Sequence, residues 1–339
     1  MNNNKSARPA VPPLAAIAVG ILAVSTASIF IRYAQTEAPS IVIAACRLAI
    51  ATLVMAPFAL TSRRAELKAL QRREFGLALL SGIFLAVHFA TWISSLEYTS
   101  VASSAVLVST TPLFVALLSP LFLKEMPTRW VTLGLVMALI GGTVVALSDA
   151  CRWQDLHLAC PSLAEFTGAK TSLGNLLALA GAAAGACYVM LGRRLRAKMS
   201  LLSYIFVVYG MAAVVLIGIM FASGSSPLGF SPSIYVWFVL LALVPQLIGH
   251  TTFNWALGFL SAAFVSITLL GEPIGTTILA YIFLQEVPGP LKILGAALIL
   301  TGLVVASKTE TKPGERQLGP ATNGPASNGS ATQSDLENA

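Results

Sequence analysis

Long apolar stretches separated by short polar connections run along almost the whole chain of 339 residues. A bilayer core about 30 Å thick needs a helix of roughly 20 apolar residues, because each residue adds about 1.5 Å of rise. The first apolar stretch is too long for the apolar part of a signal peptide and lacks a small-residue cleavage site, so we expect it to remain in the mature protein. Ten stretches approach the required length and predict ten membrane-spanning helices, at residues 13–34, 39–60, 75–97, 101–123, 128–148, 172–192, 201–222, 233–257, 262–284 and 290–307.

The composition agrees with a lipid environment. Hydrophobic residues make up 56% of the chain and charged residues 10%, against about 25% charged residues in an ordinary soluble domain. The mean hydropathy is +0.80. The chain is therefore predicted to be an all-α polytopic membrane protein whose main partner is the lipid bilayer. The net charge of +7 does not indicate nucleic-acid binding, because Lys and Arg are confined to short clusters between apolar stretches.

The distribution of Lys and Arg predicts the orientation, since cytoplasmic loops carry the excess of these residues. With both termini in the cytoplasm, sixteen of the 21 Lys and Arg residues lie inside, four lie outside and Arg47 lies within a span. The four on the outer side are Arg32, Arg152, Lys170 and Lys292. The reverse orientation would contradict the rule, so we expect N-in and C-in.

Three connecting or terminal segments lie outside the spans. Residues 1–12 form an N-terminal tail, and residues 308–339 form a C-terminal tail that is rich in Gly, Asn, Ser, Pro and Thr and is predicted to be disordered. The longest outer connection, residues 149–171, holds Cys151 and Cys160, for which an oxidising compartment makes a disulfide plausible. Cys46 and Cys187 lie in apolar spans and are expected to act as small packing residues.

The two halves of the chain repeat one another at an offset of 161 residues. Between residues 100 and 144, thirteen of 45 positions match identically without a gap. The matches that composition does not explain are Pro112 with Pro273, Glu125 with Glu286, Pro127 with Pro288, Gly134 with Gly295, and Gly141 with Gly302, and Arg32 also matches Arg193. The sequence therefore predicts two repeats, at residues 13–148 and 172–307.

Each repeat holds five spans, so the second repeat enters the membrane in the opposite direction to the first. Inverted-topology repeats are common in secondary transporters, because two similar halves provide inward-open and outward-open states of nearly equal energy. Channels and membrane enzymes do not require this symmetry. The repeat therefore favours a transporter, although a fold alone does not determine a substrate.

The repeat also resembles a known family. The segment VLVSTTPLFVALLSPLFLKEMPTRWVTLGLVMALIGGTVVA and its counterpart ITLLGEPIGTTILAYIFLQEVPGPLKILGAALILTGLVVAS resemble the paired EamA repeat of the drug/metabolite transporter superfamily. The resemblance covers nearly all of residues 13–307 and implies ten helices around a central cavity, with export of small metabolites across a bacterial inner membrane. Within the superfamily the chain looks most like the YddG-type exporters of aromatic and other amino acids.

Few ionisable side chains fall within the spans, and each is a candidate for the substrate pathway because burying it in lipid is costly. His88 and Trp92 lie four residues apart in the third span, near one helical face. The offset of 161 carries His88 to Gly249, one residue before His250. The candidate residues for the cavity are Arg47, His88, Trp92, Gln246, His250, Asn254 and Glu272, of which Gln246, His250 and Asn254 form an i, i+4, i+8 stripe after Pro245.

Glu272 departs most clearly from the symmetry, because its counterpart in the first repeat is Thr111. It stands near mid-membrane, at a depth similar to that of His250, and the two residues are candidates to share a proton. One interpretation is that Glu272 binds a substrate ammonium group or a proton. The other is that a protonated carboxyl group bonds to the broken backbone beside Pro273 and has a structural role.

The remaining candidates also have two interpretations each. Arg47 either pairs with a substrate carboxylate through its planar guanidinium group, or extends outward to the membrane surface or caps the carbonyl groups at a helix C-terminus. The two histidines either contact substrate or form interhelical hydrogen bonds. Trp92 and Trp255 offer aromatic surface to a ligand or act in packing and interface anchoring.

Glu125 and Glu286 are expected to be structural, because each lies in a Glu-x-Pro segment where a following span begins. We find no motif for nucleotide binding, zinc binding or a hydrolase nucleophile, so we expect no cofactor, no metal and no enzymatic activity. The predicted function is a secondary transporter that exports small metabolites, including aromatic or neutral amino acids, by alternating access. The alternatives are export of another metabolite or a drug-like cation, a passive channel, and an intramembrane enzyme. A monomer is expected, because one chain contains both repeats.

Overall fold

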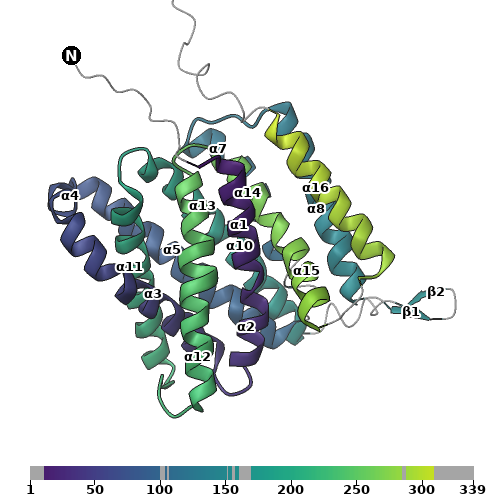
Figure 1. Cartoon of the computed structure of the whole chain (residues 1–339), viewed down its shortest axis with the longest axis horizontal. Coiled ribbons are helices and arrows are strands. Elements are labelled where there is room, and N and C mark those ends of the chain that lie inside the picture. Colours follow the sequence, from purple (N-terminus) through teal and green to yellow (C-terminus); the bar gives the residue numbers. More distant parts are fainter. Residues whose placement is uncertain are drawn as a thin grey trace, which may run out of the picture.

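The computed structural model describes residues 11–99, 104, 107–150, 152–154, 157–159, 169–284 and 288–308 (Figure 1). The predicted disorder of the C-terminal tail lies outside these residues, except for Lys308. The predicted disulfide between Cys151 and Cys160 lies outside them as well.

Helices make up the described part of the first repeat. The first span is interrupted by a turn at Thr26, which separates α1 from α2. A short helix, α4, follows the second span and was not expected from the sequence. The helices are α1 (Pro13–Ser25), α2 (Ala27–Ala34), α3 (Ser40–Ser62), α4 (Arg64–Ala69), α5 (Arg72–Tyr98), α7 (Thr111–Phe122) and α8 (Arg129–Ala150).

The connection between the two repeats contains a small β-hairpin that was not expected from the sequence, while the other elements of the described part of the chain are helical. Strands β1 (Arg152–Gln154) and β2 (His157–Ala159) pair antiparallel, with Trp153 opposite Leu158. The strands are three residues each, too short to give a periodic pattern over the four to eight residues from which a strand is recognised.

The second repeat is also helical, and two of its spans change helix type midway. The eighth span passes from an α-helix into a π-helix around Pro245, and the ninth passes through one turn of 3₁₀-helix directly before Glu272. A proline lacks a backbone N–H and disturbs the ladder of hydrogen bonds, which explains the wide turns at Pro245. The elements are α10 (Ala169–Arg196), α11 (Leu201–Ala222), α12 (Pro232–Leu241), η1 (Ala242–His250), α13 (Thr251–Ala256), α14 (Ala262–Thr268), η2 (Leu269–Gly271), α15 (Glu272–Leu284) and α16 (Pro290–Ser307).

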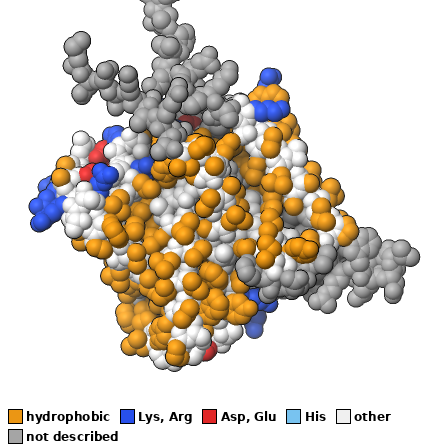
Figure 2. Space-filling model, viewed as in Figure 1, with side chains coloured by type: hydrophobic (Ala, Val, Ile, Leu, Met, Phe, Trp, Pro, Cys, Tyr) orange, Lys and Arg blue, Asp and Glu red, His pale blue; other side chains and the backbone are white. Residues whose placement is uncertain are grey.

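Six of these helical segments are long and apolar enough to cross a membrane. They are Pro13–Ala34, Ser40–Ser62, Arg72–Tyr98, Lys170–Arg196, Leu201–Ala222 and Pro232–Ala256. Four shorter apolar helices accompany them, at Thr111–Phe122, Arg129–Val144, Ala262–Gly271 and Ile293–Ser307. Large apolar side chains such as Leu53 and Leu121 are 71% and 74% exposed, and Figure 2 shows hydrophobic side chains spread over the body of the molecule. Such an apolar outer surface is typical of a protein surrounded by lipid.

Helices α8 and α16 lie side by side at one edge of the molecule (Figure 1). A Cβ atom added to Gly134 would collide with the carbonyl oxygen of Gly302, and one added to Gly141 would lie 2.6 Å from that of Gly295. Gly134 is the repeat counterpart of Gly295, and Gly141 that of Gly302, so each contact is the symmetry counterpart of the other. This exchange is the pattern of a two-fold axis and supports the inverted repeat in three dimensions.

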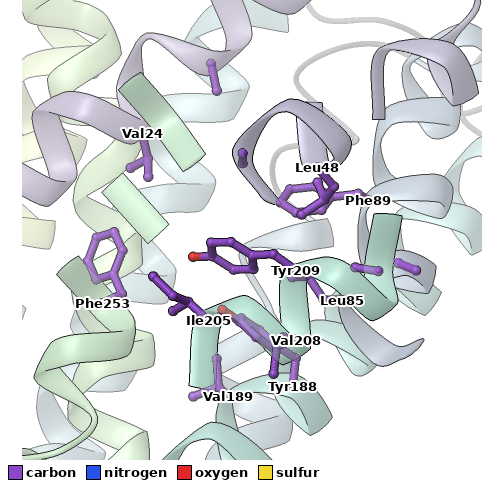
Figure 3. Packing of buried hydrophobic residues seen from close by; sticks show 14 of the residues in the cluster. Val24, Leu48, Leu85, Phe89, Tyr188, Val189, Ile205, Val208, Tyr209 and Phe253 are labelled. Atoms are coloured by element: carbon purple, nitrogen blue, oxygen red, sulfur yellow. The ribbon is translucent and has the colours of Figure 1, made fainter. Parts of the chain in front are cut away.

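The core between the other helices is built from both repeats. Figure 3 shows Val24 of α1, Leu48 of α3 and Phe89 of α5 in the same buried cluster as Tyr209 of α11. All four side chains are no more than 2% exposed. The two repeats therefore share one packed interior.

Candidate functional site

A pocket of about 80 Å³ lies between the two repeats. This volume is below the range of about 300–1,000 Å³ that is usual for small-molecule sites. Apolar residues make up about half of the lining, and the polar, ionisable and aromatic side chains in it are Arg47, His88, Trp92, Ser109, Thr111, His250, Ser266 and Glu272.

Equivalent positions of the two repeats line this pocket together. Val108 and Leu269, Ser109 and Leu270, and Thr111 and Glu272 are three pairs separated by 161 residues, and all six residues belong to the lining. The pocket therefore lies on the axis that relates the repeats. The sequence analysis did not select Ser109, Ser266 or Thr111 as pocket residues, although the alignment of Thr111 with Glu272 was a signal for Thr111.

Arg47 is completely buried and lies against the pocket. Its Nε donates a hydrogen bond to Oε1 of Gln246 at 2.9 Å, and its guanidinium carbon lies 4.3 Å from the centre of the Phe89 ring. Within the described part of the chain, Nη1 and Nη2 have no hydrogen-bond partner. Since the side chain is 0% exposed, the alternative that Arg47 extends outward to the membrane surface is wrong.

His88 is held in a defined orientation on the pocket wall. Its Nδ1 lies 2.8 Å from the carbonyl oxygen of Gly181, and because a carbonyl only accepts hydrogen bonds, Nδ1 carries the proton. The Trp92 ring stacks on the imidazole at 5.9 Å with an angle of 20°. A Cβ atom on Gly185 would lie 2.9 Å from Nδ1 of His88, so glycine at this position leaves room for the ring.

Phe89 connects the candidate residues of the two halves. Its ring contacts His88 at 5.0 Å and His250 at 5.3 Å, in addition to Arg47. The histidines that occupy nearly equivalent positions in the repeats therefore both pack edge-on against the Phe89 ring. Sequence reasoning missed Phe89, because a buried Phe in a transmembrane helix is ordinary core.

Glu272 is the first residue of α15, directly after the turn of 3₁₀-helix. Its backbone carbonyl accepts a hydrogen bond from Oγ of Ser25 at 2.9 Å, and its side chain lines the pocket. Among the described residues, Glu272 forms no ion pair within 4.0 Å with Arg47. His250 and Glu272 line the same pocket, but no hydrogen bond joins them in the part of the chain that the structure describes.

Gln246 and Asn254 support the site from behind and are absent from its lining. Gln246 binds Arg47, as described above. Asn254 Oδ1 accepts a hydrogen bond from the Tyr188 hydroxyl at 2.8 Å, and its Nδ2 donates one to the Tyr209 hydroxyl at 3.0 Å. Of the expected stripe, only His250 contacts the pocket, because the wide turns of η1 change the angular spacing on which that expectation was based.

Another contact joins the repeats near the end of α10. Arg193 Nε donates to Glu125 Oε1 at 2.9 Å, and its Nη1 donates to the carbonyl oxygen of Leu257 at 3.0 Å. Glu125 therefore has a structural partner within the described residues, while Glu286 lies outside them. No group of three or more His, Cys, Asp or Glu residues that could hold a metal ion occurs among the described residues.

Comparison with known proteins identifies the family. The model of the EamA-like transporter family matches residues 12–147 and 172–308. Together these segments span most of the chain, which therefore belongs to this family. The chain is thus a multi-pass membrane protein of a transporter family.

Individual relatives are more distant. The chain is 25% identical over 300 residues to the pseudopaline exporter CntI of Pseudomonas aeruginosa (strain UCBPP-PA14), covering 87% of this chain and 96% of that protein. It is 25% identical over 222 residues to a probable terminal-alkyne amino-acid exporter of Streptantibioticus cattleyicolor, covering 61% and 64% of the two chains. One solved crystal structure of a protein has a TM-score of 0.68 at 18% identity, covering 87% of this chain and 96% of that one, which supports the fold alone.

Proposed function

We propose that this protein is a secondary transporter that exports small metabolites across the bacterial inner membrane by alternating access, with aromatic or neutral amino acids as its substrates. The observation that carries the proposal is the pocket on the symmetry axis, which holds a buried cation and a carboxyl side chain that do not pair with each other. A zwitterionic molecule of amino-acid size offers the complementary groups. The naming of relatives as exporters, one of an amino acid, is consistent with this choice.

Each candidate residue has a role in the proposal. Glu272 accepts the substrate ammonium group or a proton, and Arg47 offers a cation. His88 and Trp92 form an aromatic wall, which suits an aromatic or other apolar side chain. His250 completes the wall from the second repeat, while Gln246 and Asn254 hold the surrounding helices in place.

The proposal includes ten membrane spans with both termini in the cytoplasm. The six long apolar helices and the four shorter ones together correspond to the ten stretches of the sequence. Exposed basic residues gather at one end of the bundle, over α4 and at one end of the α8/α16 pair (Figure 2). That end is the cytoplasmic one if the positive-inside rule holds here. The chain is proposed to act as a monomer, since it already contains both repeats.

Counterflow in proteoliposomes tests the proposal. Proteoliposomes that contain the purified protein are loaded with unlabelled substrate. They are then exposed to labelled Trp, Phe, Met, Thr, a cationic amino acid or a nucleoside. We expect saturable exchange of the aromatic or neutral amino acids. Exchange of the nucleoside alone would replace the amino-acid assignment with another metabolite, non-saturable flux would indicate a channel, and a product formed in detergent would indicate an enzyme. The absence of exchange by folded protein would remove the amino-acid assignment.

A further inference from the structure

The buried donors around Arg47 outnumber the acceptors that the protein supplies. A guanidinium group has five N–H donors and no acceptor. Gln246 accepts one of them, while Nη1 and Nη2 of Arg47 and Nε2 of Gln246 have no hydrogen-bond partner among the described residues. Buried polar groups are nearly always hydrogen-bonded, and a buried charge needs a partner even more strongly. The site is therefore short of an acceptor group.

The contacts of Arg47 determine which of its sides faces a ligand. Gln246 occupies the Nε position, and the Phe89 ring covers one face of the guanidinium plane at 4.3 Å. Neither of these two contacts involves the edge of the guanidinium group that carries Nη1 and Nη2, and the Arg47 side chain lines the pocket. Two parallel N–H groups on one edge match the two oxygens of a carboxylate.

We propose that Nη1 and Nη2 of Arg47 bind the carboxylate group of the substrate, and that Gln246 is the residue that positions Arg47 for this contact. This assignment rests on the proposed function of the pocket as the transport site, and it specifies which group of the substrate the pocket recognises. The carboxyl group of Glu272 lines the same pocket but lies beyond ion-pair distance of Arg47, so Glu272 is the group proposed to bind the substrate ammonium while Arg47 binds the carboxylate.

Gln246 is suited to this positioning role because it comes from the other repeat. Arg47 lies on α3 of the first repeat, and Gln246 lies on η1 of the second. The backbone carbonyl of Gln246 accepts a hydrogen bond from Oγ1 of Thr251 at 3.3 Å, five residues further on. Gln246 therefore lies within the wide π-helical turns of η1. The orientation of the carboxylate-binding edge therefore depends on how the two repeats are packed together.

The test compares substrates that differ only in the carboxylate. Phenylalanine, phenylalanine amide and phenethylamine are measured in counterflow, and their stabilisation of the detergent-solubilised protein against heat is measured in parallel. A site whose buried donors are left unpaired discriminates strongly against the ligand that lacks the acceptor. For the wild-type protein we expect a KM for phenylalanine about tenfold or more below the KM for its amide. The concentration of phenylalanine needed to stabilise the protein should be lower than that of the amide by a similar factor.

Variants at the two positions separate recognition from folding. Arg47→Lys keeps the charge and loses the paired donors, so we expect the KM for phenylalanine to rise about tenfold or more while the KM for the amide changes little. Gln246→Leu removes the acceptor of Nε, and we expect the preference for acid over amide to fall, with a larger change in the KM for the acid than in the maximal rate. Arg64→Gln is the matched control, because Arg64 is exposed on α4 and far from the pocket lining; it should keep the wild-type preference.

The outcomes are distinguishable from failure of the proposed function. Equal handling of phenylalanine and its amide by the wild-type protein would overturn carboxylate binding and leave amino-acid export standing. Transport of only those substrates in the wider screen that lack a carboxylate would also overturn it, while the exporter function remained. A protein that neither exchanges nor is stabilised by the acid would refute both. Equal loss for acid and amide in Arg47→Lys and Gln246→Leu would show a structural role and contradict the assignment.

Discussion

Individual ionisable residues define what this site can recognise. The second repeat places Glu272 where the first has Thr111, and both line the pocket. At this pair of equivalent positions the pocket therefore contains an ionisable group on one side only. We expect this asymmetry to link the protonation of Glu272 to transport.

Glu272→Gln tests this link. We expect the variant to transport amino acids at least about tenfold more slowly, equivalent to about 1.4 kcal/mol of lost interaction. We also expect the wild-type rate, but not the rate of the variant, to change with pH. The physical reason is that an amide of the same shape cannot take up or release a proton. Initial counterflow rates at a series of pH values measure the effect. The same rate and pH profile in both proteins would exclude Glu272 from the mechanism.

At the scale of the helices, the packing of α8 on α16 depends on a close contact that only glycine permits. In α8, Gly141 faces α16 and its added Cβ would lie 2.6 Å from a carbonyl oxygen, whereas the adjacent Gly142 has nothing within 4 Å of the same added atom. Two neighbouring glycines therefore differ completely in what a methyl group would meet. Amino-acid composition alone does not distinguish these two glycines.

The pair offers a matched experiment. We expect Gly141→Ala to lower the free energy of unfolding by about 1–3 kcal/mol, because the helices must move apart or the backbone must strain. Gly142→Ala should be neutral or raise it slightly, because Ala favours a helix over Gly. Thermal unfolding in detergent measures both variants. Equal effects of the two substitutions would contradict the close packing of α8 on α16.

The start of α11 is fixed by a contact from α4. Oε1 of Glu66 accepts a hydrogen bond from the backbone N–H of Ser200 at 2.7 Å, next to the first residue of α11. Burial acts to raise the pKa of the Glu66 carboxyl group, but the hydrogen bonds from Ser200 and the nearby charge of Arg63 outweigh this effect, so its pKa lies below its ordinary value. A carboxylate at a helix N-terminus is also favoured by the helix dipole.

The sign of this pKa change predicts a pH dependence. A lowered pKa in the folded state adds stability above the ordinary glutamate pKa of about 4.3, and this contribution is lost as the pH falls through the folded-state value. We expect Glu66→Gln to be slightly less stable than wild type at neutral pH, by less than about 1 kcal/mol because the site is partly exposed, and the difference to vanish in acid. Thermal unfolding at pH 7 and pH 4 measures it. A difference that grew in acid would contradict the assignment.

At the scale of the whole molecule, the two repeats are joined by a few polar contacts in addition to the shared core. Arg47 with Gln246 lies at the pocket, and Arg193 with Glu125 lies near one end of the bundle. Both contacts cross from one repeat to the other.

The orientation of the whole chain is tested with single cysteines. In a protein whose four native Cys residues are replaced by Ser, Cys is placed at Arg64 on α4 or at Ser226 between α11 and α12, both exposed positions. A membrane-impermeant thiol reagent should label Ser226→Cys in intact cells and Arg64→Cys only after lysis, because the positive-inside rule places α4 in the cytoplasm. The opposite pattern would reverse the orientation.

Much of the architecture was accessible from the sequence because membrane proteins restrict the possible solutions. Lipid requires every spanning segment to satisfy its own backbone, so the lengths of the apolar stretches indicate helices directly. The offset of 161 residues predicted the two repeats, and the family model and the reciprocal glycine contacts of α8 and α16 support them. The hairpin of β1 and β2 was missed, because three-residue strands leave no periodic signal.

The sequence by itself determined that this is a helical membrane protein with an inverted repeat, and it named the ionisable residues that lipid would not tolerate without a reason. Only the tertiary structure decided what each of them contacts. In the tertiary structure Arg47 is buried, Gln246 accepts its hydrogen bond and Phe89 packs on its guanidinium group. Thr111 and Glu272 line the same pocket. The physical reason is that helix periodicity gives the direction of a side chain relative to its own helix, whereas partners depend on how helices distant in the chain pack and on local changes such as the π-helix at Pro245.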